Sequence, residues 1–486
     1  MLSRIKTLLL HNRNTRQTVA KNIFWLTVGQ IGTRLLRSLV IIYAARVLGT
    51  GEYGVFSYVL GLAGFFSIFV DVGLNPILTK EAAKNPDEAI NYFATIFWIK
   101  ATFLALTALA IIFLAPHFSK IEEAKVLLPL AAILVAFDGL REFASAFFRA
   151  KEKMELEALI TTVTNVAITI FGFIILRKIP TAGALVTTYA LSAGTGTLLA
   201  VFLLRHELRS ILSRFKKELL KPILILAWPI ALVSLTSVLM LNVDIIMLGF
   251  FKTAQDVGLY SAGQKIVQLL YVFPAILAAS LYPVFARFVG QKNNERVKEL
   301  MENGVAMSLL LAIPLATGGI ILAQSIIRFL YGASYGAAAP IFQALLFTVF
   351  TNFLSAHFAN YIMVYDQQKR SPMIVLAGSL ANVVFCGILI PLYGALGAAI
   401  ATVLAQALFQ GLLWRLTKQI NNYDTLRHLK KITFSAVVMG AIAFTLNTLG
   451  LHVIVNIGIS AIVYFVILYM LKEKTLLEIK YLFSRI

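Results

Sequence analysis

The sequence predicts an all-α polytopic membrane protein with 14 transmembrane helices, built as two parallel six-helix lobes plus two C-terminal helices. The lobes are expected to be related by a pseudo-two-fold axis along the membrane normal. Three observations predict this fold. Of the 486 residues 59% are hydrophobic and only 14% are charged, membrane-length apolar stretches recur along the whole chain, and two short motifs occur twice. A bilayer core is about 30 Å thick, so each spanning helix needs roughly 20 mostly apolar residues.

The apolar stretches also set the predicted domain limits. Basic segments at 205–221 and 417–431 separate an N-lobe (22–204), a C-lobe (222–416) and a final helix pair (432–471). A basic segment (1–21) precedes the first span, and a tail (472–486) follows the last. The spans are expected at 22–48, 54–78, 90–114, 124–147, 157–177, 182–204, 222–251, 258–283, 304–326, 339–364, 372–392, 394–416, 432–450 and 452–471.

The net charge of +20 would suggest nucleic-acid binding in a soluble protein. Here most of the 43 Lys and Arg lie in the N-terminal segment, the even-numbered loops and the C-terminal tail. This asymmetry follows the positive-inside rule, so both termini are expected on the cytoplasmic side of a plasma (inner) membrane. The basic loops then face anionic lipid headgroups, and no nucleic acid is expected as a partner.

A repeat is visible at two places in the chain. RVLGTGEYGVFSY at 46–58 resembles IMLGFFKTAQDVGLYSA at 246–262, since each has Leu-Gly at the end of one span and Gly with an aromatic residue opening the next. PTAGAL at 180–185 matches PLYGAL at 391–396, and both open the sixth span of their half. Two matches that flank the same number of spans indicate a duplicated chain.

The number of spans in each repeat sets how the two halves are oriented. Six is even, so both halves enter the membrane in the same direction. Two parallel lobes then face each other across a cleft, and rocking of one lobe against the other exposes a midplane site to each side in turn.

Several charged residues lie inside the predicted spans. A charge at the bilayer centre costs roughly 2.5 to 3.5 kcal/mol even on a lenient scale, so most are expected to face protein or a water-filled cavity. They are Arg34, Arg37, Asp71, Lys100, Asp138, Arg141, Glu142, Asp244 and Lys265.

Basic residues dominate the interior of the N-lobe. Gln30, Arg34 and Arg37 are spaced i, i+4, i+7 and therefore share one helix face. A surplus of arginine suits an anionic ligand, because guanidinium makes paired hydrogen bonds to phosphate and keeps its charge when dehydrated. The predicted binding residues for a phosphate or sugar in a central cavity are Arg34, Arg37, Lys100, Arg141 and Gln30.

The acidic residues of the N-lobe allow two interpretations. Asp138 and Glu142 lie on one stripe with Arg141, and Asp71 lies on a polar stripe of the second span. Either these acids neutralise the basic residues and hold the helices together, or they take part in coupling transport to H+ or Na+.

Asp244, in the stretch LNVDIIMLGFF, and Lys265 are the charges inside the C-lobe spans. Asp244 lies about seven residues before the end of an outward span, and Lys265 about seven after the start of the next, so both sit roughly 10 Å below the outer surface. The sequence therefore predicts an ion pair between them. It is either a static clamp or a protonation site.

The sequence predicts no enzymatic activity and no resident cofactor. The single cysteine, Cys386, falls in a predicted span, and the six histidines lack metal-ligand spacing. No phosphate-binding glycine loop and no nucleophile with a paired base is recognisable.

Four stretches carry a family resemblance: ARVLGTGEYGVFSYVLGLAGFFSIFVDVGL (45–74), LNVDIIMLGFFKTAQDVGLYSAGQKI (241–266), LYGASYGAA (330–338) and PLYGALGAAIATV (391–403). In this order they resemble the polysaccharide biosynthesis proteins of the O-antigen flippase type. These are the lipid-linked oligosaccharide branch of the multidrug/oligosaccharidyl-lipid/polysaccharide exporter superfamily. The resemblance covers spans one to twelve.

The resemblance implies a flippase that moves an oligosaccharide on a polyprenyl phosphate or pyrophosphate carrier from the cytoplasmic to the outer leaflet, for cell-surface polysaccharide or glycan assembly. The implied partners are the polyprenyl-linked oligosaccharide, membrane lipids, and glycosyltransferases or a polymerase of the same pathway. The arginines would hold the phosphate, polar groups the sugars, and the lipid tail would stay in the bilayer.

Two other functions fit the sequence less well. A cation-coupled multidrug antiporter of the same superfamily would need an uncompensated acid in an apolar cavity, whereas this interior is rich in arginine. A non-transporting scaffold for glycosyltransferases would have little reason to keep charged stripes on several helices.

Overall fold

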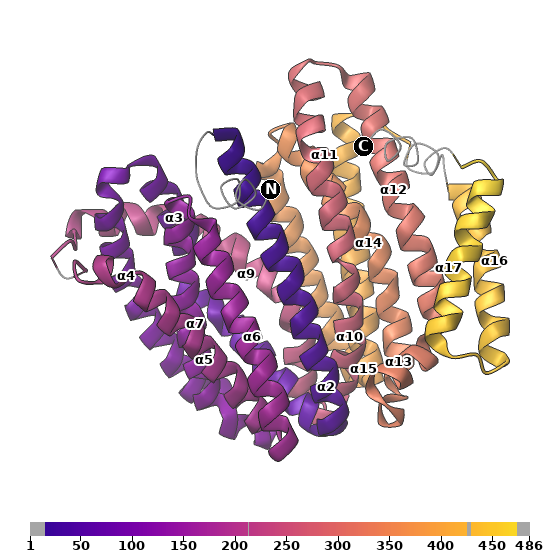
Figure 1. Ribbon diagram of the computed structural model, residues 1–486, viewed down its shortest axis with the longest axis horizontal. Helices are drawn as coiled ribbons and strands as arrows, with labels where there is room; N and C mark the ends of the chain where they lie inside the picture. The colour runs from indigo at the N-terminus through magenta and orange to yellow at the C-terminus, as the bar shows by residue number, and fades with distance from the viewer. Residues whose placement is uncertain (1–14, 212, 425–428, 474–486) are drawn as a thin grey trace, which may run out of the picture. The chain divides into compact units, whose positions relative to one another are not determined.

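The computed structural model describes residues 15–211, 213–424 and 429–473, with side chains from Arg37 onward except at 276, 279 and 280. Within these ranges the regular elements are helices (Figure 1). They are α2 (Thr15–Asp71), α3 (Leu74–Lys84), η1 (Pro86–Glu88), α4 (Ala89–Leu109), η2 (Ala110–Leu114), η3 (Ala115–Phe118), α5 (Glu122–Ala150), α6 (Met154–Lys178), α7 (Ala182–Leu203), α8 (Arg205–Leu208), η4 (Lys217–Leu219), α9 (Leu220–Phe251), α10 (Ala254–Leu270), α11 (Val272–Gly290), α12 (Asn294–Ile321), α13 (Ala323–Tyr331), η5 (Ala333–Tyr335), α14 (Ala338–Val364), η6 (Gln368–Arg370), α15 (Ser371–Ile420), α16 (Leu429–Thr448) and α17 (Val453–Met470).

Ten helical stretches in the described part of the chain are long and apolar enough to cross a membrane. Gln368–Ile420 contains two of the predicted spans, and Arg37–Lys84 contains one together with the second half of 22–48. The chain is therefore a multi-pass membrane protein that is all-helical in its described part, as predicted, while the total of 14 spans stays a prediction.

Single glycines join the predicted spans within α2 and α15. Gly49 (φ 72°) interrupts α2, and Gly394 (φ 57°) interrupts α15, with helix on both sides of each. Positive φ costs glycine little because it has no Cβ, so one residue suffices at Gly49, where a loop of five residues was predicted, and at Gly394, where the predicted spans are one residue apart. Both glycines belong to the repeated motifs, LG in the first and YGAL in the second.

The second predicted span is broken rather than continuous. α2 ends at Asp71, Val72 (φ 43°) and Gly73 (φ 78°) adopt left-handed conformations, and α3 begins at Leu74. A Cβ added to Gly73 would lie 2.8 Å from the carbonyl oxygen of Ala227 in α9. Glycine at this position therefore permits both the break and the close approach of α9.

The chain forms two compact units, Met1–Gly258 and Leu259–Ile486, whose boundary falls inside α10. The first unit contains α9 as well as the helices of the predicted N-lobe. The predicted domain limits divide the chain by its sequence repeat, whereas the compact units divide it by contacts. The predicted limits therefore stay predictions.

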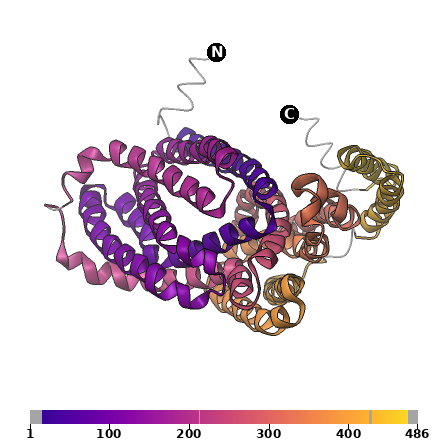
Figure 2. The same cartoon turned by 90° about the horizontal axis from the view of Figure 1, so that it is seen from below.

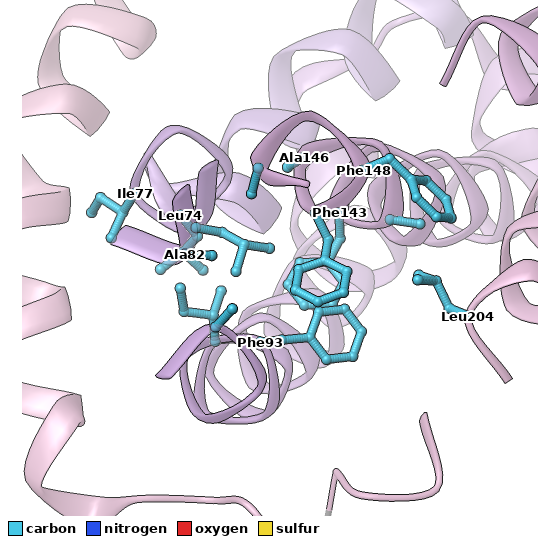
Figure 3. Close-up of a cluster of buried hydrophobic side chains, with 14 of the residues drawn as sticks. Leu74, Ile77, Ala82, Phe93, Phe143, Ala146, Phe148 and Leu204 are labelled. Carbon is cyan, nitrogen blue, oxygen red and sulfur yellow. The ribbon is translucent and has the colours of Figure 1, made fainter. Parts of the chain in front are cut away.

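Aromatic packing forms the core at one end of the first unit. Phe93 of α4 stacks on Phe143 of α5, with ring centroids 4.9 Å apart (Figure 3). The ring of Phe147 lies 4.4 Å from that of Phe93. In lipid the hydrophobic effect does not draw helices together, so packing and hydrogen bonds between helices must do so. Thr79 of α3 supplies such a bond by donating to the carbonyl oxygen of Ala146 (3.0 Å).

The two copies of the first repeated motif touch each other inside the first unit. Gly54 in α2 and Gly258 in α10 hold equivalent positions in the two copies. A Cβ on Gly54 would lie 1.7 Å from the carbonyl oxygen of Ala254, and one on Gly258 would lie 1.9 Å from that of Thr50. The backbones of the two helix starts are therefore in direct contact, which only glycine allows.

The second unit is held together by α12, α14, α15 and α16. Tyr464 of α17 donates to the carbonyl oxygen of Leu310 in α12 (2.8 Å), and Asn456 of α17 donates to that of Ala443 in α16 (2.9 Å). Figure 2 shows α16 and α17, in yellow, lying side by side. The final helix pair is thus fixed to the second unit by buried polar contacts.

Candidate functional site

Lys100 of α4 forms a buried ion pair at the break between α2 and α3. Its Nζ lies 3.0 Å from Oδ1 of Asp71 and 3.0 Å from Oδ1 of Asn75, while its side chain is only 1% exposed. The Asn75 backbone N–H also donates to Asp71 (3.2 Å), so the carboxylate binds the first turn of α3 as well. In this conformation the ammonium group of Lys100 therefore binds protein side chains.

Arg141 of α5 is placed between two acids of its own helix. Its guanidinium contacts Asp138 at 3.1 Å and Glu142 at 2.9 Å. The arginine side chain is 13% exposed, whereas the two carboxylates are 44% and 47% exposed. On the predicted stripe the two carboxylates are therefore accessible, and the arginine between them is mostly buried.

Arg37 is an exposed cation in the middle of α2. Its guanidinium carbon lies 5.1 Å from the centre of the Tyr189 ring of α7, a cation–π distance. An aromatic face attracts the cation without neutralising its charge. Gln30 and Arg34 lie in the same helix, but their side chains lie outside the described residues.

The charged residues of the N-lobe lie at successive depths along their helices. At 1.5 Å per residue, Arg37 is roughly 18 Å from the kink at Gly49, and Asp138 is roughly 24 Å from the start of α5. The Asp138 carboxylate acts on Arg37, and the Glu142 carboxylate acts on Lys100. We call this set the N-lobe charge cluster: Arg37, Asp71, Lys100, Asp138, Arg141 and Glu142.

The two C-lobe charges fall in different compact units. Asp244 of α9 belongs to the first unit, where it is 1% exposed and Oδ1 accepts from the backbone N–H of Ile245 (2.9 Å). Lys265 of α10 belongs to the second unit, where Nζ donates to Gln268 (3.2 Å). The ion pair between Asp244 and Lys265 therefore stays a prediction.

Sequence reasoning missed a polar continuation of the cluster on α5 and α6. Arg149 of α5 contacts Glu157 of α6 at 3.4 Å, and Thr164 and Asn165 continue the α6 face. The signal was present, because Glu157 and Asn165 are eight residues apart, which places them on one helix face. Both charges were overlooked because they lie at the edges of predicted spans.

The basic segment after α7 is tied to the same end of the first unit by two ion pairs. Glu207 of α8 binds Lys151 in the α5–α6 turn (2.6 Å), and Glu88 of η1 binds Lys216 (2.8 Å). Burial alone would raise the pKa of Glu207. The hydrogen bond and charge of Lys151, with the charge of His206, outweigh burial and hold that pKa below its usual value.

No three or more His, Cys, Asp or Glu side chains in the described part of the chain gather in a way that could hold a metal ion. The site therefore consists of ion pairs, an aromatic-stacked arginine and hydroxyl or amide groups. These groups are suited to bind an anion or a sugar.

Comparison with known proteins gives two family matches and several relatives. The polysaccharide biosynthesis protein model matches residues 19–289, and the MatE model matches 229–388. The probable low-salt glycan biosynthesis flippase Agl15 of Haloferax volcanii is 22% identical over 400 residues, covering 80% of this chain and 81% of that protein. A putative O-antigen transporter of Shigella flexneri is 22% identical over 422 residues, covering 84% of this chain and 100% of that one.

A solved structure supports the fold. The Lipid II flippase MurJ in an inward closed conformation superposes with a TM-score of 0.72 at 16% identity, covering 92% of this chain and 98% of that one. The first family match spans more than half of the 486 residues, and it includes all six residues of the N-lobe charge cluster. The chain therefore belongs to the polysaccharide biosynthesis protein family, as the order of its motif stretches predicted.

Proposed function

We propose that this chain is a flippase that moves polyprenyl-(pyro)phosphate-linked oligosaccharide units from the cytoplasmic to the outer leaflet. The observation that carries this function is Arg37, an exposed residue in the middle of an apolar helix, beside a cluster in which the other described cations are paired. An exposed arginine at this depth is costly unless a ligand or water meets it. The flippase names of the relatives support the same function.

Arg37 and Arg34 are proposed to bind the phosphate, with Gln30 binding a neighbouring sugar. Lys100 and Arg141 are proposed to hold the helices of the cluster together in this conformation. Lys100 would reach the ligand only if its ion pair with Asp71 breaks, and Arg141 only if its ion pair with Glu142 breaks. The acids thereby balance the cluster when no ligand is present.

The proposal includes the transport cycle. Fourteen spans would form two parallel six-helix lobes (22–204 and 222–416), related by an axis along the membrane normal, that rock against each other, with 432–471 as an added pair. The protein would lie in the plasma (inner) membrane with both termini cytoplasmic, and it would transport rather than catalyse. H+ or Na+ is proposed as the coupling ion, and glycosyltransferases or a polymerase of the same pathway as partners.

The test uses purified protein in liposomes that contain a fluorescent polyprenyl-diphosphate oligosaccharide. The Arg34→Gln, Arg37→Gln double variant is expected to lose at least about tenfold in flipping rate, because charge-assisted hydrogen bonds to the phosphate are removed. Arg296→Gln is the matched control, since its ion pair with Glu299 is exposed (61% and 57%). Full flipping by a folded double variant would refute the anion site.

A cation-coupled multidrug antiporter is the second candidate, and the MatE match over 229–388 favours it. Such a protein would bind an organic cation through acids. Asp138 and Glu142 are accessible, but each contacts Arg141, which lowers their attraction for a cation.

A further inference from the structure

Two polar stripes face each other between α5 and α6, and they run from the N-lobe charge cluster to the end of the α5–α6 hairpin. The α5 stripe is Asp138, Arg141, Ser145 and Arg149, spaced i, i+3, i+7, i+11, and the α6 stripe is Glu157, Thr161, Thr164 and Asn165, spaced i, i+4, i+7, i+8. Each spacing places its residues on one helix face. α6 is otherwise strongly apolar, so a polar face on it needs an explanation.

Contacts at both ends show that the stripes face each other. At one end Arg149 and Glu157 are 3.4 Å apart. At the other end, a Cβ added to Gly196 of α7 would lie 2.0 Å from Oγ1 of Thr164 and 3.0 Å from Cδ of Arg141. Arg141 and Thr164 are therefore neighbours, and the absence of a side chain at Gly196 leaves room for both.

Three buried polar atoms along these stripes have no hydrogen-bond partner among the described residues. They are Oγ of Ser145, Nε of Arg149 and Oε2 of Glu157. The Ser145 side chain is 1% exposed, and an unsatisfied buried group costs about 1 to 3 kcal/mol unless a ligand or water meets it. The 3.4 Å between Nε of Arg149 and Oε2 of Glu157 also exceeds the roughly 2.8 Å of a charge-assisted hydrogen bond, so the two residues form an ion pair without a hydrogen bond between these atoms.

The depth of these residues orders them along a path. Arg149 is the penultimate residue of α5, and Glu157 lies in the first turn of α6, so both sit at the end of the hairpin. Arg141 comes eight residues before Arg149 in α5, so it lies roughly 12 Å farther from the end of the hairpin. With the proposed topology this end is cytoplasmic, where the phosphate of an inner-leaflet lipid lies.

We propose that the facing stripes of α5 and α6 form an entry track for the sugar–phosphate headgroup, with Arg149 as its loading site. This rests on the proposed function and names a binding site that precedes the central one. The phosphate would replace Glu157 as the partner of Arg149, and sugar hydroxyls would bond with Ser145, Thr161 and Thr164. The ligand would then pass to Arg37.

The test measures initial flipping rate against the mole fraction of the fluorescent polyprenyl-diphosphate oligosaccharide in liposomes. Arg149→Gln is expected to raise the half-saturating mole fraction about tenfold and to leave the maximal rate within about twofold. Arg149→Lys should recover part of the lost affinity, because it keeps the charge but not the paired hydrogen bonds. Glu157→Gln should lower the half-saturating value, since it removes the carboxylate that competes with the phosphate for Arg149.

The alternative role is a clamp that only joins α5 to α6. A clamp predicts that Arg149→Gln and Glu157→Gln lower thermal stability equally and leave half-saturation unchanged, and that result would overturn the track. Arg296→Gln again serves as the control. Flipping by the wild type together with unaltered kinetics in Arg149→Gln would refute the track alone, whereas no flipping by the wild type would refute the proposed function and the track together.

Discussion

Lys100 and Asp71 form an ion pair across 3.0 Å that ties α4 to the broken end of α2, with the lysine side chain only 1% exposed. Removing one partner leaves a buried charge without compensation, which is far more costly than removing both. This asymmetry separates a structural pair from a ligand-binding lysine.

Asp71→Asn is predicted to lower the free energy of unfolding by about 3 kcal/mol, and the double change with Lys100→Met is predicted to recover most of the loss. Thermal unfolding of the detergent-solubilised protein measures both variants. Lys125→Met is the control, because Lys125 pairs with a 78% exposed Glu122 and should contribute under about 1 kcal/mol. A stable Asp71→Asn variant that no longer transports would instead give Lys100 a direct role in binding.

Gly54→Ala is predicted to disrupt the crossing between α2 and α10. The new Cβ would lie 1.7 Å from the carbonyl oxygen of Ala254, which is backbone and cannot rotate away. The folded yield and the melting temperature should fall sharply. Gly51→Ala in the same helix is the matched control, since its Cβ would meet nothing within 4 Å, and a change there should stay within about 0.5 kcal/mol. Equal behaviour of the two variants would show that the crossing is not tight in the working protein.

The Lys151–Glu207 pair is predicted to make stability depend on acid pH. The pKa of Glu207 lies below its ordinary value of 4.5 in the folded protein, so the pair stabilises fully above pH 4.5. That contribution is lost as pH falls through the lowered pKa. Melting temperature measured from pH 3 to 6 should therefore decline less steeply in Glu207→Gln than in the wild type. Parallel curves would contradict this assignment.

Asp244→Asn is predicted to separate a clamp from a protonation site. Asp244 is 1% exposed, so a static clamp would make its loss a stability defect with no effect on the pH profile of transport. Flipping rates of the wild type and the variant are compared between pH 5 and 8. A profile that flattens in the variant would assign Asp244 to ion coupling, and identical profiles would remove that role.

Much of the polar interior could be predicted from spacing alone. The i, i+3, i+4 pattern of Asp138, Arg141 and Glu142 placed them on one face, and the structure brings Arg141 into contact with both acids. Periodicity cannot assign partners on different helices. For this reason the pairing of Lys100 with Asp71, which is 29 residues away, required the three-dimensional structure.

Breaks and joints within helices were harder to predict. Hydropathy measures how apolar a window is, so it could not distinguish the one-residue kink at Gly49 from a loop or detect the break at Val72 and Gly73. Arg149 and Glu157 were not among the predicted site residues for a related reason, because charges at the ends of spans usually reach the lipid headgroups. Only their mutual contact and their unsatisfied atoms set them apart.

The most direct test of the central claim is a two-substrate assay with the purified wild-type protein in liposomes. One set of vesicles carries a fluorescent polyprenyl-diphosphate oligosaccharide in one leaflet, and the other encloses a cationic dye. The exposed Arg37 and the paired acids predict flipping of the lipid-linked sugar and no protein-dependent movement of the dye. Export of the dye, driven by an H+ or Na+ gradient and without movement of the lipid-linked sugar, would contradict the account.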